Sequence, residues 1–389
     1  MQRGTEPMRV LHIAAGNLYG GVETFLVTLA RFRQSAPALE QEFALCFDGR
    51  LRSELAAAGA SVHSLGAVRV RQPISIWKAR HRLRAILNER RTDVVVCHMA
   101  WPYAIFAPVV RGSERSLVFW LHMATDGSHW LERWARMTAP DLAIAPSRFV
   151  AETLPTLFPR VDAHVIHYAV AAPDGSERIE RSKVRAELNT PADSIVIVQA
   201  CRLEQWKGQA VHLRALAELR DLPGWICWMV GGAQRPHEMR FLGALKAQAS
   251  ELGITERVRF AGQRADVPRV LAAADIYCQP NTGLEGLPII FTEALDAGLP
   301  IVTTDIGGFD EIVDDSCGIR VAPDDSAAAA GALRSLVTDP LLRKRLGAAG
   351  PARARSLCDP GSQIQAMKTL FDELSGNRED DGIATAHSL

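Results

Sequence analysis

Strand-type and helix-type segments alternate from one end of the chain to the other, and this alternation restricts the fold more than any other feature. The strand-type runs are rich in Val, Ile, Leu and Phe and lack strict polar alternation, which is typical of strands covered on both faces. Strands separated by helices in this way form parallel sheets in α/β folds. We predict strands at 10–15, 42–47, 93–98, 117–122 and 142–146, then at 195–200, 226–230, 258–261, 276–279, 300–304 and 319–322.

The chain is long enough for two domains. Its 389 residues exceed the roughly 250–300 at which a single hydrophobic core stops growing. The stretch AAPDGSERIERSK carries Pro, Gly, Ser and mixed charge without an apolar face, as connections between domains do. We predict a first domain at 1–170, a linker at 171–190 and a second domain at 191–359. A last helix is expected near 363–374, and the polar tail at 376–389 is predicted to be disordered.

Composition excludes several classes of protein. Lys plus Arg and Asp plus Glu number 44 each, so the charge balance gives no indication of a nucleic-acid partner. The seven cysteines are scattered and form no metal-binding spacing, which favours reduced thiols in a cytoplasmic protein without a metal site. There is no apolar signal core near the N-terminus and no apolar run long enough for a membrane span. We therefore expect a cytoplasmic protein, and leave open a position at the inner face of the membrane.

The strongest motif is EGLPIIFTEA, which contains Glu285 and Glu293. Pro288 suits the first turn of a helix, so Glu285 should lie in the preceding loop and Glu293 in the second helical turn. The first amide groups of such a helix form a phosphate site, and the two carboxylates could accept hydrogen bonds from a sugar and a ribose. These amides belong to Gly286, Leu287, Ile289 and Ile290. The alternative is a buried loop with two surface glutamates.

A second motif, RLEQWKG, places Arg202 at a strand end and Lys207 at the start of the next helix. Two cations there would neutralise a diphosphate and stabilise its departure. A solvated basic pair is the alternative interpretation.

Two glycine pairs could let a ligand approach the backbone closely. Gly20 and Gly21 begin the first helix, and Gly231-Gly232 follows the strand ICWMV. The first pair does not form the GxGxxG pattern of dinucleotide-binding folds. Plain tight turns are the alternative for both.

Two histidines, His98 and His122, are predicted at strand ends in the first half. The carboxyl ends of strands are where open α/β sheets bind ligands, and a neutral imidazole there could bond a sugar hydroxyl or assist an acceptor's proton. The simpler interpretation is a structural hydrogen bond, which we favour for His98 and not for His122.

A basic helix is expected at 74–91, where six Lys or Arg accompany one Glu around an apolar stripe. It is either the solvated outer face of a sheet-covering helix or a contact with an anionic membrane or lipid phosphate.

Taken together, these segments resemble the family 4 retaining glycosyltransferases (glycosyl transferases group 1) of GT-B fold. The resemblance covers nearly all of residues 8–375, and its most specific part is EGLPIIFTEALDAGLPIVTTD. The segments in chain order are GGVE, DVVVCH, VFWLH, IAPS, CRLEQWKG, WMVGG, RVRFAGQRADV, ADIYCQPN, EGLPIIFTEALDAGLPIVTTDIGG and CGIRVAP.

The resemblance implies a fold and a set of roles. The fold would be two Rossmann-like α/β domains facing across a cleft, with a helix at 360–375 crossing back to the first domain. Arg202 and Lys207 would bind the donor diphosphate, Glu293 the ribose and Glu285 the transferred sugar, with His122 near the anomeric carbon. The loop at 260–264, including Gln263 and Arg264, would hold the base. The family uses no metal or cofactor, and the donor is a nucleoside-diphosphate sugar.

The expected activity is retaining transfer of a hexosyl group to a carbohydrate or lipid-linked acceptor in cell-surface polysaccharide or glycolipid synthesis. Two alternatives remain: a nucleotide-sugar 2-epimerase of the same fold, and a catalytically silent nucleotide-sugar-binding protein. Base, sugar, acceptor and linkage are not readable from the residues.

Overall fold

The computed structural model describes residues 6–171 and 181–386, with the backbone alone for 377–386. The chain divides into two compact units. The first contains the residues up to Val170 and those from Cys358 onward, and the second is Ala171–Leu357.

The first unit is built on a seven-stranded sheet in the order β3-β2-β1-β4-β5-β6-β7, with every pair of neighbours parallel. Its strands are β1 (Met8–Ala14), β2 (Leu39–Leu45), β3 (Ser61–Ser64), β4 (Val94–His98), β5 (Ser116–Trp120), β6 (Leu142–Ala145) and β7 (Ala163–Val165). Its helices are α1 (Gly21–Arg31), α2 (Arg50–Ala57), α3 (Pro73–Glu89), α4 (Ala100–Arg111), α5 (Trp130–Ala135), α6 (Arg148–Ala151) and α14 (Pro360–Ala386).

The second unit repeats this plan with a six-stranded parallel sheet in the order β10-β9-β8-β11-β12-β13. The strands are β8 (Ile195–Ala200), β9 (Trp225–Val230), β10 (Val258–Gly262), β11 (Ile276–Gln279), β12 (Ile301–Thr304) and β13 (Gly318–Val321). The helices are α7 (Arg181–Glu187), α8 (Gln209–Ala217), α9 (Pro236–Glu251), α10 (Val267–Ala272), α11 (Ile289–Asp296), α12 (Ser326–Thr338) and α13 (Pro340–Cys358).

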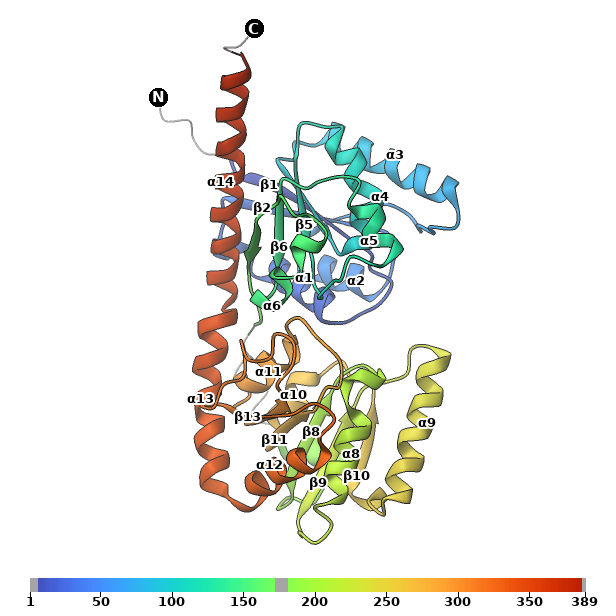
Figure 1. The fold of residues 1–389 in the computed structure, drawn as a ribbon, viewed down its shortest axis with the longest axis vertical. Helices are drawn as coiled ribbons and strands as arrows, with labels where there is room; N and C mark the ends of the chain where they lie inside the picture. Colours follow the sequence, from blue (N-terminus) through green and yellow to red (C-terminus); the bar gives the residue numbers. More distant parts are fainter. Residues whose placement is uncertain (1–5, 172–180, 387–389) are drawn as a thin grey trace. The chain divides into compact units, whose positions relative to one another are not determined.

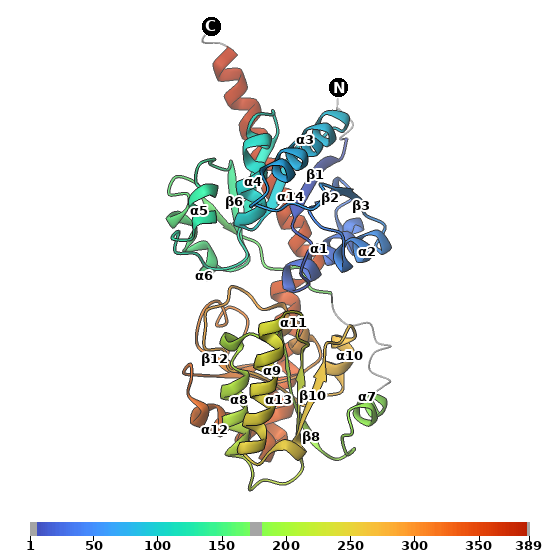
Figure 2. The ribbon, with the colours of Figure 1, turned by 90° about the vertical axis from the view of Figure 1, so that its right-hand side faces the viewer.

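Helices cover both faces of each sheet. In the first unit, α3, α4 and α5 pack on one face, and α14 lies on the other beside α1 (Figure 1). In the second, α8 packs between α9 and α12 on one face (Figure 2). Two-sided coverage explains why these strands read as continuous apolar runs, and it confirms the predicted α/β fold class.

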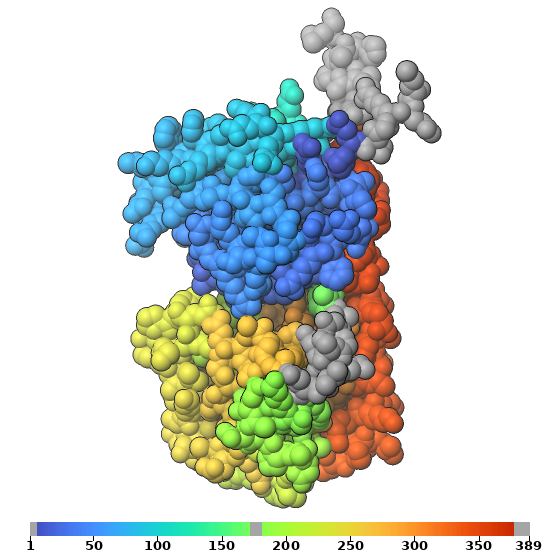
Figure 3. Space-filling view, turned by 180° about the vertical axis from the view of Figure 1, so that it is seen from behind, coloured from blue at the N-terminus to red at the C-terminus, as the bar shows by residue number. Residues whose placement is uncertain are grey.

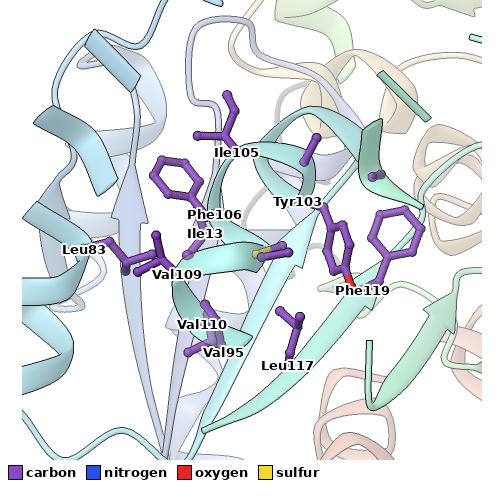
Figure 4. Close-up of a cluster of buried hydrophobic side chains, with 14 of the residues drawn as sticks. Ile13, Leu83, Val95, Tyr103, Ile105, Phe106, Val109, Val110, Leu117 and Phe119 are labelled. Carbon is purple, nitrogen blue, oxygen red and sulfur yellow. The ribbon is translucent and has the colours of Figure 1, made fainter. Parts of the chain in front are cut away.

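The apolar residues of the central strands form the cores. All five residues of β4 and of β5 are buried. Phe106, Val109 and Val110 of α4 lie among Val95 and Leu117 of these strands (Figure 4). This packing anchors the central strands of the first sheet, so the loops at their carboxyl ends start from fixed points.

Several element predictions were wrong or incomplete. The strands β3 and β7 were missed, because none of their residues is fully buried and they lack long apolar runs. Within the segment predicted as a linker, Arg181–Glu187 forms α7; the linker's residues 172–180 lie outside the described ones. The tail predicted to be disordered from 376 continues α14 as helix to Ala386.

The helix α7 belongs to the second unit through charge as well as apolar burial. Arg185 is 4% exposed, and its guanidinium donates to Asp275 Oδ2 at 2.7 Å, while Arg181 donates to Asp275 Oδ1. Figure 3 shows the light-green residues of α7 against the yellow to orange residues that lead into α10, which α7 contacts. A helix held by a buried arginine carries little of the apolar signal that sequence patterns detect.

Candidate active site

The second sheet places the two strongest motifs side by side. Its strand order reverses at β8 and β11, which are neighbours, and ligands of open α/β sheets bind at the carboxyl ends of strands where the order reverses. Arg202 follows β8 by two residues, and Glu285 lies in the loop after β11. Segments 83 positions apart in the sequence (285 minus 202) therefore reach one edge of one sheet.

Lys207 and Glu285 are in direct contact. The Lys207 ammonium donates to Glu285 Oε1, and the lysine is only 6% exposed. Its Nζ also lies 4.2 Å from the centre of the Trp206 ring, which adds a cation–π contact. The ammonium is thus oriented by a carboxylate and an aromatic face.

A chain of buried amides fixes Glu285 from the other side. Asn281 donates to Glu285 Oε2 at 3.0 Å, and Gln279 donates to Asn281 Oδ1 at 2.9 Å. The Tyr277 hydroxyl donates to Gln279 Oε1 at 2.7 Å, and all three supporting residues are fully buried. Satisfied buried networks hold their members rigidly, so Glu285 is preorganised.

Two glycines permit the close backbone approach around this pair. Gly208 has φ of +73°, and a Cβ there would lie 1.8 Å from the carbonyl oxygen of Pro280. Gly307 has φ of +65°, and a Cβ there would lie 2.3 Å from the carbonyl oxygen of Glu285. Neither position tolerates a side chain without displacing the loop that carries Glu285.

The helix after Glu285 begins where a phosphate site requires it. Pro288 is the N-cap of α11 rather than its first helical residue, a shift of one position from the prediction. The first two amides of a helix that begins at Ile289 have no carbonyl partner within it, whereas the third, that of Phe291, already donates to the Pro288 carbonyl at 3.0 Å. Gly286 and Leu287, buried just before the helix start, complete this turn, and Glu293 lies partly buried in the second turn as predicted.

Arg202 takes part in a small charged cluster. Its Nη1 lies 3.2 Å from Glu204 Oε1, and the arginine side chain is 41% exposed. Arg235, the residue before α9, approaches the same Glu204 oxygen at 3.4 Å. Glu204 and Arg235 could not be identified from the sequence, because an Arg–Glu pair separated by one residue is common on surfaces.

In the loop predicted to hold the base, the one charged side chain, Arg264, is already paired with carboxylates of the protein. Arg264 donates to both carboxylate oxygens of Asp266, at 2.8 and 2.6 Å, and to Glu187 at 3.0 Å. These bonds raise the pKa of Arg264 and occupy its guanidinium. Gln263 packs against Gly232, where an added Cβ would lie 2.6 Å from the Gln263 Cβ.

A hydrogen-bonded series of histidines leads from His12, inside β1, to the carboxyl edge of the first sheet. His12 Nδ1 lies 2.9 Å from His98 Nε2, and His98 Nδ1 lies 2.9 Å from His122 Nε2. The series ends at Tyr168, whose hydroxyl lies 2.8 Å from His122 Nδ1. All four side chains are at most 6% exposed. We call these four residues the histidine relay.

Burial keeps the histidine relay neutral. Loss of solvent lowers the pKa of His12 to about 4 and that of His122 to about 3, and lowers the pKa of His98 well below its usual range. A neutral imidazole has one N–H, so His98 and His122 must each donate to one partner and accept from the other, while His12 takes part through Nδ1 alone. The three rings therefore share one tautomer: all carry the proton on Nδ1 or all on Nε2.

This geometry changes the interpretation of His122. The residue lies two positions after β5 rather than within it, and both ring nitrogens are already hydrogen-bonded inside the first unit. A base needs a free lone pair and an accessible pKa, and His122 has neither in this arrangement. The sequence missed His12 and Tyr168 as members of the relay, although a histidine inside the apolar run VLHIAA is a signal that could have been followed.

In the glycine pair of the first unit, one of the two amides already forms a hydrogen bond within the helix that it begins. Gly20 is the N-cap of α1 and Gly21 the first helical residue, and Glu23 Oε2 accepts from the Gly20 amide at 2.9 Å. A ligand phosphate would meet the remaining amides of the first turn.

The basic helix α3 presents cations beside apolar side chains. Ile74 and Trp77 are 70% and 63% exposed, unusual for residues of this size. An open pocket of about 620 Å³ at its start is lined by Arg71, Lys78 and Arg82 together with Ile74. We call the surface formed by Arg71, Ile74, Trp77, Lys78 and Arg82 the α3 surface.

The comparisons with known proteins agree with this geometry. Residues 180–353 match the family model of glycosyl transferases group 1, and residues 19–172 match that of glycosyltransferase family 4. The chain belongs to the group 1 glycosyltransferases. The resemblance predicted from the sequence is confirmed.

The similarity to curated relatives covers most of this glycosyltransferase. It is 28% identical over 368 residues to the lipopolysaccharide core biosynthesis glycosyltransferase LpsD of Rhizobium meliloti, covering 94% of this chain and 98% of that protein. It is 29% identical over 326 residues to the GDP-mannose-dependent alpha-(1-6)-phosphatidylinositol monomannoside mannosyltransferase of Mycolicibacterium smegmatis, covering 77% and 80% of the two chains.

Solved structures show the same fold. The glycosyltransferase superimposes on HepE of Anabaena, solved in complex with UDP, with a TM-score of 0.82 at 23% identity, over 94% of this chain and all of that one. A glycosyltransferase from Rickettsia africae gives 0.82 at 17% identity, covering 95% and 98%. With its two parallel sheets, the enzyme has the GT-B fold.

Two structural features are absent from the described part of the glycosyltransferase. Within residues 6–171 and 181–386, no helix combines the length and the apolar character needed to cross a bilayer. Among the side chains described, those of residues 6–171 and 181–376, no group of three or more His, Cys, Asp or Glu is placed to hold a metal ion.

Proposed function

We propose that this glycosyltransferase moves a sugar from a nucleoside-diphosphate sugar to an acceptor hydroxyl, with retention of anomeric configuration and without a metal ion. The observation that carries the proposal is the contact of Lys207 with Glu285 beside Arg202, at the point where the second sheet reverses its strand order. The UDP in the structurally similar HepE supports a nucleotide donor.

Each group of the second unit then has a chemical role. Arg202, Lys207 and the start of α11 stabilise negative charge on the departing diphosphate. Glu285, held by Asn281, accepts a hydrogen bond from a hydroxyl of the transferred sugar. Glu293 accepts from the ribose hydroxyls, and the backbone of the loop containing Gln263 contacts the base.

We propose same-face attack within this frame. The bond from the anomeric carbon to the leaving phosphate oxygen breaks, and the acceptor oxygen bonds to that carbon on the same face. The acceptor's proton passes to the departing phosphate, so no protein base is required. His122 is not needed as a base in this reaction, in keeping with the two hydrogen bonds that occupy its ring nitrogens.

The acceptor class follows from the relatives. One is named for lipopolysaccharide core biosynthesis and another for a phosphatidylinositol mannoside. We propose a carbohydrate or lipid-linked acceptor in cell-surface glycolipid or polysaccharide synthesis, with the enzyme in the cytoplasm at the inner face of the membrane.

The α3 surface supports the membrane part of this proposal. Exposed Ile74 and Trp77 can enter the headgroup region while Arg71 and Lys78 meet anionic lipids. Flotation with vesicles containing phosphatidylglycerol should recover the enzyme, and Trp77→Ser with Lys78→Glu should abolish recovery. Equal recovery with neutral phosphatidylcholine vesicles, or no loss in the variant, contradicts the contact.

A panel of UDP-, GDP- and ADP-sugars in a thermal-shift assay identifies the donor, because a ligand that binds the folded state raises the melting temperature. Product analysis with that donor and a lipid-linked acceptor, in the presence of a chelator, tests transfer, retention and metal independence together. An altered sugar formed from donor alone would indicate the epimerase, and binding without turnover the silent protein. An inverted product contradicts retention.

A further inference from the structure

A second arginine lies beside Arg202 at the carboxyl edge of the second sheet. Arg235 precedes α9 and follows β9, which is the neighbour of β8. Its Nη2 lies 3.4 Å from Glu204 Oε1, and Arg202 Nη1 lies 3.2 Å from that same oxygen. One carboxylate oxygen thus draws two guanidinium groups together, and both remain about 40% exposed (41% and 39%).

Arg235 is held in place by a different carboxylate. Its Nε donates to Glu238 Oε1 at 2.8 Å. Glu238 is 3% exposed, and its other oxygen accepts from the backbone amides of Gln234 and Arg235 at 2.5 and 3.0 Å. The Nε side of the guanidinium is therefore anchored by a buried carboxylate whose oxygens both accept hydrogen bonds. The Nη2 group faces Glu204.

Glu204, by contrast, is poorly satisfied. Its Oε2 is buried without a hydrogen-bond partner, and its two contacts are longer than the roughly 2.7–2.9 Å of good charge-assisted bonds. The carboxylate separates two like charges without strong bonds to either. A phosphate group, with more acceptor oxygens, can bond both guanidinium groups bidentately.

The balance of charges around Arg202 is consistent with Glu204 acting as a counterion that a ligand can replace. Three cations (Arg202, Lys207 and Arg235) meet three carboxylates (Glu204, Glu238 and Glu285) through the contacts given above. Lys207 is paired with Glu285 and Arg235 with Glu238, so Glu204 is the carboxylate left to balance Arg202. An arriving diphosphate competes with this group for the same N–H donors.

We propose that Arg235 is a third phosphate-binding cation of the donor site, and that Glu204 is an internal counterion whose place the donor's diphosphate takes. The inference rests on the proposed function, since it assumes that the donor is a nucleoside diphosphate derivative. The two predicted diphosphate-binding motifs follow β8 and β11. Arg235 would add a phosphate-binding residue that follows a third strand, β9.

The test is calorimetric titration of the full-length protein. The probe is whichever of UDP, GDP or ADP stabilises the wild type most, with the matching nucleoside run beside it. Arg235→Met keeps the apolar stem, and Arg235→Lys keeps the charge. Glu204→Gln keeps the shape and removes the charge. Matched controls are Arg240→Met, on the exposed face of α9, and Glu251→Gln, at the far end of that helix.

Arg235→Met should weaken binding of the diphosphate by about tenfold or more, the usual loss for a hydrogen-bonded charge. Arg235→Lys should retain part of the affinity, and Glu204→Gln should tighten diphosphate binding several-fold. Nucleoside binding and both controls should match the wild type.

Three results overturn the inference. An Arg235→Met affinity equal to that of Arg240→Met removes Arg235 from the site. A parallel loss of nucleoside binding in both Arg235→Met and Arg235→Lys shows that Arg235 supports the structure of the site rather than binding the phosphate. Weaker binding by Glu204→Gln shows that Glu204 positions Arg202 rather than competing with the ligand. If the wild type binds none of the three diphosphates, the proposed function fails first.

Discussion

The carboxyl edges of the two sheets differ in chemistry although the strands that form them follow the same order. In the first unit the edge is a buried, neutral series of histidines, each bonded to the next. In the second unit it is a cluster of arginine, lysine and glutamate that includes half-exposed guanidinium groups. The same fold thus supports a charge-handling edge in one unit and a rigid uncharged edge in the other.

Under the proposed function, this difference is a division of work between a unit that binds the diphosphate and one that does not. A diphosphate needs cations that a ligand can reach, and these lie in the second unit. The histidines of the relay in the first unit are buried and neutral, so they do not provide such cations. The predictions below test this division in order of expected effect.

Removing a cation of the second edge should have the largest effect. Lys207→Ala and Arg202→Ala should each lower turnover by about 10²–10³-fold, because each removes a group that stabilises the leaving diphosphate. Steady-state assays with the identified donor measure this, and Lys246→Ala on α9 is the control for loss of a lysine. Turnover near that of wild type in both variants would end the charge-handling interpretation.

Neutralising Glu285 should lower turnover without weakening nucleotide binding. We expect Glu285→Gln to reduce kcat by about 10–100-fold, since the proposed function has Glu285 contact the sugar rather than the diphosphate. The Kd for the nucleoside diphosphate should stay constant or fall, because Lys207 loses its competing carboxylate. A rise in Kd that parallels the loss of kcat would place Glu285 in nucleotide binding instead.

The first unit should be the more acid-sensitive of the two. A histidine whose folded pKa is depressed binds its proton only on unfolding, so stability is full above pH 6.5 and falls as the pH drops toward the folded values of about 4 for His12 and 3 for His122. The second unit also contains one such residue, His212, with a pKa of about 3.

The variant His12→Phe keeps an aromatic ring against Phe43 and removes one titrating group. Its unfolding free energy should depend less on pH between 6.5 and 4, by up to about 3 kcal/mol over that interval. Denaturant titrations at several pH values, followed by a probe in the first unit, measure the difference. Parallel pH dependences of variant and wild type would show that His12 is already solvated or charged in the fold.

The histidine relay should be recognisable in NMR spectra. We expect it to have little effect on the turnover rate. In ¹⁵N-histidine NMR spectra, His12, His98 and His122 should remain neutral from about pH 5 to 8 and report a single shared tautomer. Mixed tautomers, or titration of any of the three near pH 6.5, would contradict the hydrogen-bond series.

Much of the fold could be predicted because the buried strands are continuous apolar runs. The strands β3 and β7 could not, because exposed or half-buried short strands lack that signal. The helix α7 escaped prediction for a similar reason: it is anchored by Arg185, and a buried arginine looks like a surface residue in a sequence.

The site was predicted in parts. Because Lys207 and Glu285 both follow predicted strands, the sequence placed them at the carboxyl edge of a sheet. Their contact joins residues 78 positions apart, and it could not be predicted without knowing that β8 and β11 are neighbours. The relay and the Glu204–Arg235 contact depend on side-chain orientation, which no spacing rule supplies. The roles of all these residues toward the donor stay predictions.

The most direct test of the account is the binding of a nucleoside diphosphate to the second edge. Titration of the best-stabilising nucleoside diphosphate into wild type and into Arg202→Met with Lys207→Met should show binding that the double variant weakens by at least about a hundredfold. Circular dichroism should show the same fold in both. Equal affinity in two equally folded proteins would mean that the diphosphate binds elsewhere.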